Sequence, residues 1–130
     1  MSVSSKANVS DIETYLCKMF KSVSDHVFPS APDTLGKDWE DMLVISCDNG
    51  VNDYNGYGNG NALLFAYARP HSNGTKNVKK LSAMEKAILD LIETQDSSGN
   101  YYVHRIRSFS DYDYSRNWHC NVISIGITVK

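Results

Sequence analysis

The sequence predicts one α+β domain, in which two amphipathic helices pack on a mostly antiparallel four-stranded sheet in the order αββαββ. Two observations carry this prediction. Apolar residues recur at helical spacing in two segments, and four other segments are short and rich in β-branched and aromatic residues. At 130 residues, one domain can bury about two-thirds of its unfolded surface. We expect a flexible amino-terminal tail over 1–9 and the folded domain over 10–130.

The first helix is predicted by a capping box followed by helical periodicity. Ser10 and Glu13 have the spacing at which a hydroxyl and a carboxylate satisfy the free backbone amides of a helix start. The apolar residues that share one face of this helix are Ile12, Tyr15, Leu16, Met19, Phe20 and Val23. Pro29 and Pro32 predict that the helix ends near residues 25 and 26, because proline disfavours helical geometry in the residue before it.

Two strands and a long loop follow the first helix. Met42 to Cys47 is a short apolar run with β-branched residues, which predicts a buried strand. Residues 48–61 are rich in glycine, asparagine and aspartate, so we expect a loop without regular structure. Ala62 to Ala68 predicts the second strand, and its small side chains Ala66 and Ala68 offer a face on which a helix can pack.

A second capping box predicts the second helix. Ser82 and Glu85 have the required spacing, and the helix should end by Gln95, before a polar turn. Its apolar face consists of Met84, Ala87, Ile88, Leu91 and Ile92. Two final strands are predicted over 101–109 and 118–129, where aromatic and β-branched residues are frequent.

Composition argues against several classes of protein. The net charge is −2 and the basic residues form no stripe, so we expect no specific nucleic-acid partner. Cys17, Cys47 and Cys120 are widely spaced and form no CxxC pair, so we interpret them as small core residues in a reducing compartment. The amino terminus lacks a signal-peptide pattern and no apolar run approaches about 20 residues, so we expect neither secretion nor a membrane partner.

The candidate chemical sites are weak, and we expect no enzyme, no metal and no cofactor. The segment from Asp53 to Gly58 resembles the start of a calcium loop, but Leu64 stands where the twelfth, acidic ligand is required. If the last two strands pair about a turn between residues 111 and 112, His104 and His119 lie opposite each other. Without an identifiable third ligand, we interpret them as a structural or surface pair; a hydrolase would need a pocket joining them to Asp or Glu.

The strand that begins at Tyr101 leaves another alternative open. Residues 101–107 alternate aromatic and basic side chains, as in a sheet on which RNA bases stack. We favour a half-exposed strand whose Arg105 and Arg107 form cross-strand or intersubunit ion pairs, because the chain is acidic overall. The alternative function is a small ligand- or RNA-binding α+β module.

The order and spacing of these elements resemble the tail-terminator and tail-completion proteins of long-tailed bacteriophages and prophages. Four features carry the resemblance: the opening amphipathic helix, the strand 42–47 with its long loop, the strand 63–69 leading into the helix 81–92, and the closing pair of strands. An acidic turn, a His or aromatic residue and a regular final strand, as in residues 111–127, are also typical of the family. The similarity spans about residues 10–129 and contains no catalytic motif.

This resemblance implies a virion structural protein that forms a ring, usually of six copies, on the tail tube and joins it to the head-tail connector. The expected partners are other copies, the tail-tube protein and the connector, and the expected location is the virion, or the host cytoplasm during assembly. Aromatic residues near loops are the expected contacts, because interfaces favour Tyr and Trp. The candidate interface residues are Asp53, Tyr54, Tyr57, Arg105, Arg107, Tyr112, Tyr114, Arg116 and Trp118.

Overall fold

The computed structural model describes residues 8–47, 52–54, 57–96 and 98–129, and only the backbone at 52–54, 57 and 58. Its elements are α1 (Val9–Met19), a 3-10 turn (Lys21–Val23), β1 (Val27–Phe28), β2 (Asp41–Cys47), β3 (Asn52–Tyr54), β4 (Tyr57–Ala68), α2 (Val78–Glu93), β5 (Tyr101–Asp113) and β6 (Trp118–Val129). The α+β class and the two helices are as predicted. No described helix is long and apolar enough to cross a membrane.

The sheet has more strands than predicted. Its order is β1-β2-β4-β6-β5, and β3 pairs with β4 beyond the end of β2. β1 runs parallel to β2, and every other pairing is antiparallel. The prediction of four strands in the order αββαββ is therefore wrong. β1 has only two residues, too few to show a period of two, and the composition of β3 is typical of turns.

The segment predicted to be an irregular loop, residues 48–61, contains regular structure at its described positions. β3 and the first residues of β4 form a hairpin, in which Asn52 is opposite Asn59 and Tyr54 is opposite Tyr57. The other side of β4 pairs with β6 from Gly58 onward. The hydrogen bonds between β4 and β6 thus outweigh the weak strand propensity of glycine and asparagine. Residues 48–51, 55 and 56 lie outside the described residues.

Both helices begin earlier than their predicted capping boxes. In α1 the cap is Asn8: its side chain accepts a hydrogen bond from the Asp11 amide at 2.8 Å, and the Asp11 carboxylate accepts one from the Asn8 amide at 3.2 Å. Asn and Asp thus make the reciprocal pair predicted for Ser10 and Glu13, and Val9, assigned to the tail, is helical. In α2 the cap is Asn77, whose side chain accepts from the Lys80 amide at 3.1 Å.

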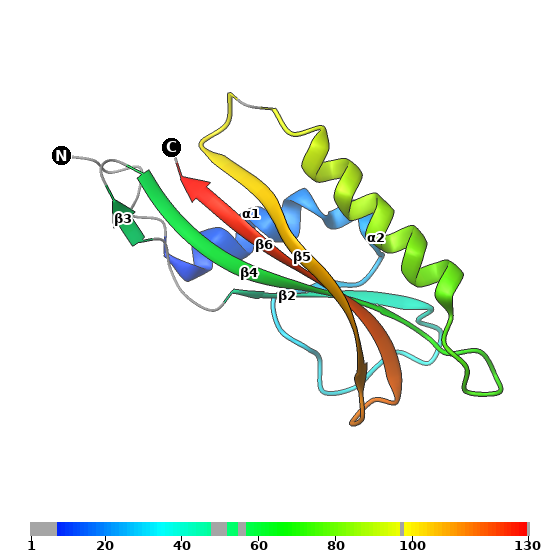
Figure 1. The fold of residues 1–130 in the computed structure, drawn as a ribbon. Coiled ribbons are helices and arrows are strands. Elements are labelled where there is room, and N and C mark those ends of the chain that lie inside the picture. Colours follow the sequence, from blue (N-terminus) through cyan, green and yellow to red (C-terminus); the bar gives the residue numbers. More distant parts are fainter. Residues whose placement is uncertain (1–7, 48–51, 55–56, 97, 130) are drawn as a thin grey trace.

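The helices cover one face of the sheet (Figure 1). Their buried apolar side chains meet Ala62, Leu64 and Ala66 of β4, so the small face of this strand receives the helices as predicted. The buried side chains that the helices contribute are Ile12, Leu16, Met84, Ile88 and Ile92, with Phe20 at the end of α1. The earlier start of α2 also buries Leu81, and the Lys80 ammonium lies 2.9 Å from the Asp41 carboxylate of β2.

The opposite face is covered by residues 29–40, which connect β1 to β2 without helix or strand (Figure 1). A second apolar cluster lies beneath this segment, built on Met42, Val44, Tyr67, Cys120 and Val122, with Trp118 buried among them. Phe28, Leu35 and Trp39 pack against it. Cys17 and Cys47 pack against the apolar cluster between the helices and the sheet, which we call the helix-side cluster. Cys120 belongs to the second cluster, so all three cysteines adjoin an apolar cluster.

Candidate interaction surface

The β5–β6 hairpin carries most of the predicted interface residues, and its tip is a tightly bonded turn. Residues 114–117 form the turn, closed by a hydrogen bond from the Asn117 amide to the Asp113 carbonyl at 2.7 Å. Asn117 has a φ of 59°, in the left-handed region that asparagine tolerates better than most residues. The strand therefore continues to Asp113 rather than ending at Phe109 as predicted.

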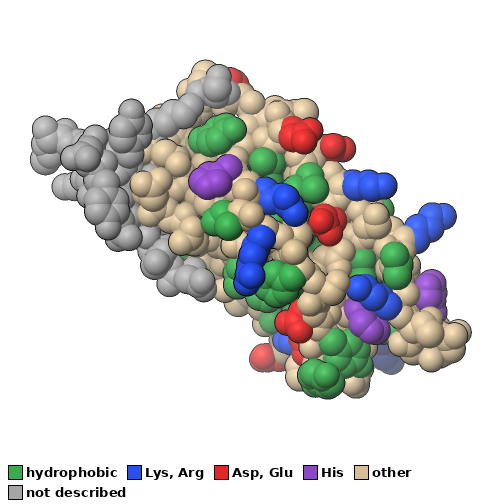
Figure 2. All heavy atoms as spheres, in the orientation of Figure 1, with side chains coloured by type: hydrophobic (Ala, Val, Ile, Leu, Met, Phe, Trp, Pro, Cys, Tyr) green, Lys and Arg blue, Asp and Glu red, His purple; other side chains and the backbone are tan. Residues whose placement is uncertain are grey.

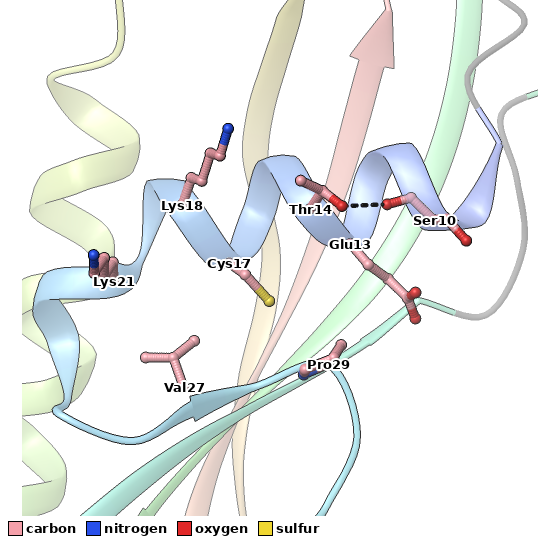
Figure 3. A pocket seen from close by; sticks show the side chains of 8 residues that line it. All are labelled: Ser10, Glu13, Thr14, Cys17, Lys18, Lys21, Val27 and Pro29. Atoms are coloured by element: carbon pink, nitrogen blue, oxygen red, sulfur yellow. Dashed lines mark hydrogen bonds between the residues drawn. The ribbon is translucent and has the colours of Figure 1, made fainter.

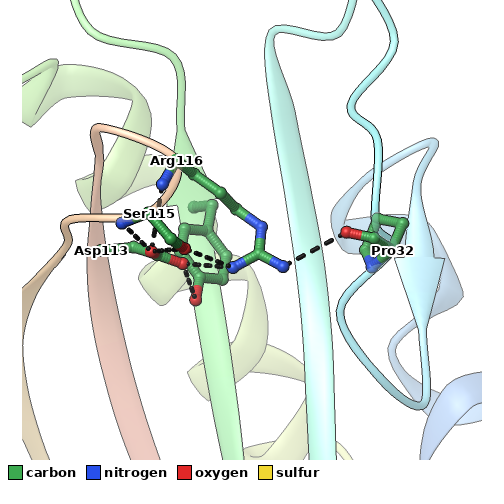
Figure 4. Close-up of polar contacts among 5 residues, drawn as sticks. Pro32, Asp113, Ser115 and Arg116 are labelled. Atoms are coloured by element: carbon green, nitrogen blue, oxygen red, sulfur yellow. Dashed lines mark hydrogen bonds and ion pairs between the residues drawn. The ribbon is translucent and has the colours of Figure 1, made fainter.

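The Asp113 carboxylate organises this turn (Figure 4). It accepts hydrogen bonds from the Ser115 hydroxyl at 2.6 Å, the Arg116 guanidinium at 2.6 Å and the Tyr67 hydroxyl at 3.2 Å. Burial raises the pKa of Asp113, but the hydrogen bonds from Ser115 and Arg116 outweigh burial and lower the pKa to about 2. The carboxylate is therefore ionised at neutral pH and serves a structural role.

A row of aromatic rings lies next to the turn. Tyr114 meets Tyr112 edge to face, with ring centroids 4.9 Å apart, and Tyr112 meets His119 in the same way at 4.7 Å. The Tyr112 hydroxyl donates to the Asn117 side chain at 3.2 Å. Tyr114 is 85% exposed. A large, rigid and exposed aromatic side chain at a hairpin tip is a residue that protein interfaces favour.

Two further candidate interface residues, Arg116 and Trp118, make contacts within the subunit. The Arg116 guanidinium donates to the Pro32 carbonyl at 3.2 Å and so ties the turn to the segment 29–40 (Figure 4). Trp118 is only 5% exposed, and the Arg69 guanidinium lies 5.1 Å from its ring centroid. Trp118 was expected at an interface, but its ring packs in the second apolar cluster and contributes to the core of the subunit.

Arg105 and Arg107 lie exposed on β5, the edge strand of the sheet. The Arg105 side chain donates to the Ser108 hydroxyl at 3.0 Å, and the Arg107 guanidinium lies 4.9 Å from the ring centroid of Phe109. Neither has an ion-pair partner among the described residues of this chain. The predicted cross-strand ion pairs are therefore not formed there within one subunit, and both charges remain available to another molecule.

Three predicted interface residues lie in the β3–β4 hairpin. Asp53 and Tyr54 belong to β3 and Tyr57 begins β4, and the side chains of all three lie outside the described residues. Their backbone position is defined by β6, since Gly58 is opposite Val129 at the end of that strand. The β5–β6 turn lies at the other end of β6. The two groups of candidate interface residues therefore occupy opposite ends of the sheet (Figure 1).

The two histidines do not face each other. His104 is opposite Gly126, where an added Cβ would lie 2.5 Å from the imidazole, and His119 is opposite Tyr112. The predicted pairing is wrong because the hairpin turn lies at residues 114–117 and not between residues 111 and 112, so β5 is longer than expected. The described residues contain no group of three or more His, Cys, Asp and Glu that could hold a metal ion.

A groove of about 500 Å³ lies between α1 and β1, and the Cys17 sulfur points toward it (Figure 3). Burial, assisted by the nearby Glu13, raises the pKa of this thiol, so it stays protonated and is a weak nucleophile. A second groove of about 370 Å³ separates α2 from the carboxyl-terminal half of β5. Its polar side chains bond to one another, Lys76 to Ser110 at 3.1 Å and Asn121 to Glu85 at 3.0 Å.

The structure shows exposed residues on β5 that were not among the candidate interface residues. Tyr102 is 42% exposed, Ile106 51% and Phe109 38%, all on β5. Figure 2 shows histidine, basic, hydrophobic and acidic side chains following one another along the strip that β5 occupies in Figure 1. The alternating aromatic and basic residues of this strand indicated that it is exposed. They could not show which side chains share a face, because the bulge at Ile106 shifts the alternation by one residue.

The fold and this surface define the class of the molecule, an α+β protein with helices on one face of its sheet and an exposed, aromatic and charged edge strand. Neither the models of known protein families nor the curated protein sequences contain a match to this chain.

Proposed function

We propose that the chain is a bacteriophage or prophage structural protein similar to tail terminators, which forms a ring on the tail tube and joins it to the head-tail connector. One observation carries the proposal: the two hairpins with candidate contact residues lie at opposite ends of one sheet. A ring requires two different, complementary surfaces on each subunit, because each copy contacts one neighbour with one surface and the next neighbour with the other.

The exposed tip of the β5–β6 hairpin supports an assembly role. Tyr114 is 85% exposed, although its large ring would gain free energy from burial. The hydrogen bonds of Asp113 and Arg116 hold the turn that carries it in one conformation. A preorganised aromatic side chain loses little conformational entropy on binding. On this proposal, the tip contacts the β3–β4 end of a neighbouring copy or the tube.

Mass photometry of the chain alone and in the presence of a tail-tube protein from a long-tailed bacteriophage tests the proposal. We expect a species of about six times the subunit mass of 14.6 kDa. Tyr114→Ser should weaken the association constant of each subunit contact at least tenfold, about 1.4 kcal/mol, and so reduce the yield of the ring without lowering the stability of the fold, because the side chain is exposed. Val78→Ser, which alters an exposed apolar residue on α2, is the matched control and should assemble normally. A chain that forms no ring with or without the tube protein would contradict the proposal.

A second candidate is the single-stranded RNA-binding module, favoured by the exposed Tyr102, Arg105, Arg107 and Phe109 on β5. Bases could stack on the two rings while the two guanidinium groups neutralise phosphates. Fluorescence anisotropy with labelled oligonucleotides at several salt concentrations separates this candidate from the first. Binding that weakens steeply with salt, and less steeply in the double variant Arg105→Ala/Arg107→Ala, would favour it.

A further inference from the structure

The outer edge of β5 has no partner strand in the described part of the chain, and its two halves differ. In the first half, the Gln95 side chain imitates a neighbouring strand: it accepts from the Val103 amide at 2.7 Å and donates to the Val103 carbonyl at 2.6 Å. This contact blocks pairing at Val103, and the bulge at Ile106 interrupts the edge again. Residues 107–111 carry neither obstacle.

The backbone of this stretch points its bonding groups outward at every second residue. The Tyr112 amide donates to the adjacent Asp111 carboxylate at 2.8 Å, from which we infer that it points away from β6. Because the direction alternates along a strand, the backbone groups of Ser110 and Ser108 face outward as well. The edge therefore offers the backbone groups of Ser108 and Ser110, one residue on each side of Phe109, for hydrogen bonds to another strand.

The side chains on this stretch are complementary to the same stretch of a second copy that runs in the opposite direction. Phe109 is opposite Val122 and Asp111 is opposite Cys120, both members of the second cluster, so these side chains lie on the face away from the helices. Arg107 lies on the same face, since its guanidinium stacks on Phe109. The order along the edge is therefore cation, aromatic ring, anion, and all three side chains are exposed.

We propose that two copies of this chain pair antiparallel through the β5 edge, with Phe109 on the two-fold axis. In this register each Arg107 lies opposite Asp111 of the partner subunit, and the two Phe109 rings lie opposite each other on the same face. Ser108 and Ser110 form the backbone hydrogen bonds of the new ladder. The two sheets become continuous, with the helices of both copies on one face.

This contact is distinct from the contact of a ring. A two-fold contact uses the same surface on both copies and closes after two subunits, whereas a ring contact joins two different surfaces. The dimer is thus a state of the free protein that shields an exposed edge strand, and it does not depend on the proposed function. Its test uses the protein alone, so its failure would leave the ring proposal standing.

Charge reversal provides the first test, by sedimentation velocity from about 1 to about 300 µM, a range suited to a small interface. We expect wild-type dimers. Arg107→Glu and Asp111→Arg should each weaken association at least tenfold, because each places like charges opposite each other twice. An equimolar mixture of the two variants should restore dimers, because every opposed pair then has opposite charges.

Lys86→Glu is the matched control for Arg107→Glu, since it makes the same change in net charge at an exposed position of α2 and should leave the dimer intact. A wild-type protein that stays monomeric over the whole range would overturn the proposal. Dimers that persist in both single variants, or variants whose mixture fails to associate, would overturn it as well.

Disulfide trapping tests the register. Directly opposed residues in a non-hydrogen-bonded antiparallel pair have Cα atoms about 4.5 Å apart, which a disulfide can bridge. Phe109→Cys should therefore form a covalent dimer under mild oxidation. Ser108→Cys should not, because in this register its counterpart lies diagonally at about 7–8 Å. The wild type, with its three native cysteines, is the background control; trapping through Ser108→Cys but not Phe109→Cys would overturn the register.

Discussion

The two faces of the sheet are covered in different ways. On the helix face, α1 and α2 satisfy their own backbone hydrogen bonds, so apolar side chains alone can hold them in place. On the other face, the irregular segment 29–40 has carbonyl groups that need donors. Arg69 donates to the carbonyls of Trp39 at 2.7 Å, Lys37 at 3.0 Å and Gly36 at 3.2 Å.

On the face without helices, charged side chains organise the covering segment. Arg69 enters the segment from the end of β4 and Arg116 from the β5–β6 turn, where it bonds to Pro32. Gly36 completes the arrangement, because a Cβ there would lie 2.1 Å from the Trp39 ring. The helix face should therefore respond mainly to lost volume, and the other face mainly to lost hydrogen bonds.

The largest expected effect tests the helix face. Ile88→Ala removes a side chain with no exposed surface from the centre of the helix-side cluster. We expect a loss of about 3 kcal/mol in the free energy of unfolding, from lost burial and the remaining cavity. Urea unfolding followed by circular dichroism measures it. Val78→Ala, at a position 62% exposed on the same helix, should change stability by less than about 0.5 kcal/mol.

The next prediction tests the other face. Arg69→Met keeps the length of the side chain but removes three hydrogen bonds and the stacking on Trp118. We expect a loss of about 2 kcal/mol, because the carbonyls of Trp39 and Gly36, which are partly buried, and the exposed carbonyl of Lys37 lose a charged donor. Both tryptophans of the chain, Trp39 and Trp118, lie on this face, so their emission should shift to longer wavelength while the helical signal persists.

Arg105→Met is the control for that experiment, since Arg105 is exposed on β5 and should leave the tryptophan emission unchanged. An Arg69→Met protein with native emission and stability would show that apolar contacts alone hold the segment, and the contrast between the faces would fail.

A pH titration tests the role of Asp113 where the β5–β6 turn meets the segment 29–40. Its folded pKa of about 2 lies below the usual value of about 3.9, so the ionised carboxylate stabilises the fold above pH 4 and loses this effect as the pH falls toward 2. Asp113→Asn should therefore cost about 2 kcal/mol at pH 7. Urea unfolding measures the free energy of unfolding of the wild type and of Asp113→Asn at pH 7 and near pH 2. The difference between the two proteins should be smaller at the acid end, and a difference that does not change with pH would contradict this role of Asp113.

The smallest effect concerns the turn itself. Asn117→Ala should cost about 1 kcal/mol, because alanine tolerates a φ of 59° poorly and also loses the bond from the Tyr112 hydroxyl. Asn117→Gly loses the same bond but relieves the backbone, so it should be the more stable of the two variants in thermal unfolding. Equal stability of the two variants would show that backbone strain is unimportant here.

The sequence predicted elements whose periodicity is long, and missed those that depend on partners. Both helices and the strand 118–129 repeat their apolar pattern over many residues, and the structure contains them with shifted starts in the helices. β1 and β3 exist because β2 and β4 pair with them, which no local pattern reveals. Tyr112, Tyr114 and Trp118 were all predicted as candidate interface residues. The sequence could not reveal that Trp118 is buried, because its burial depends on a segment about 80 residues earlier in the chain.

The α+β class, the two amphipathic helices and the small alanine face that receives them could be predicted from the amino-acid order, because side-chain periodicity is a local property of the chain. Tertiary structure decided the strand order, the bulge at Ile106 and therefore which side chains of β5 share a face. Those features depend on hydrogen bonds between segments distant in sequence, where the displacement of one residue moves a side chain to the opposite face.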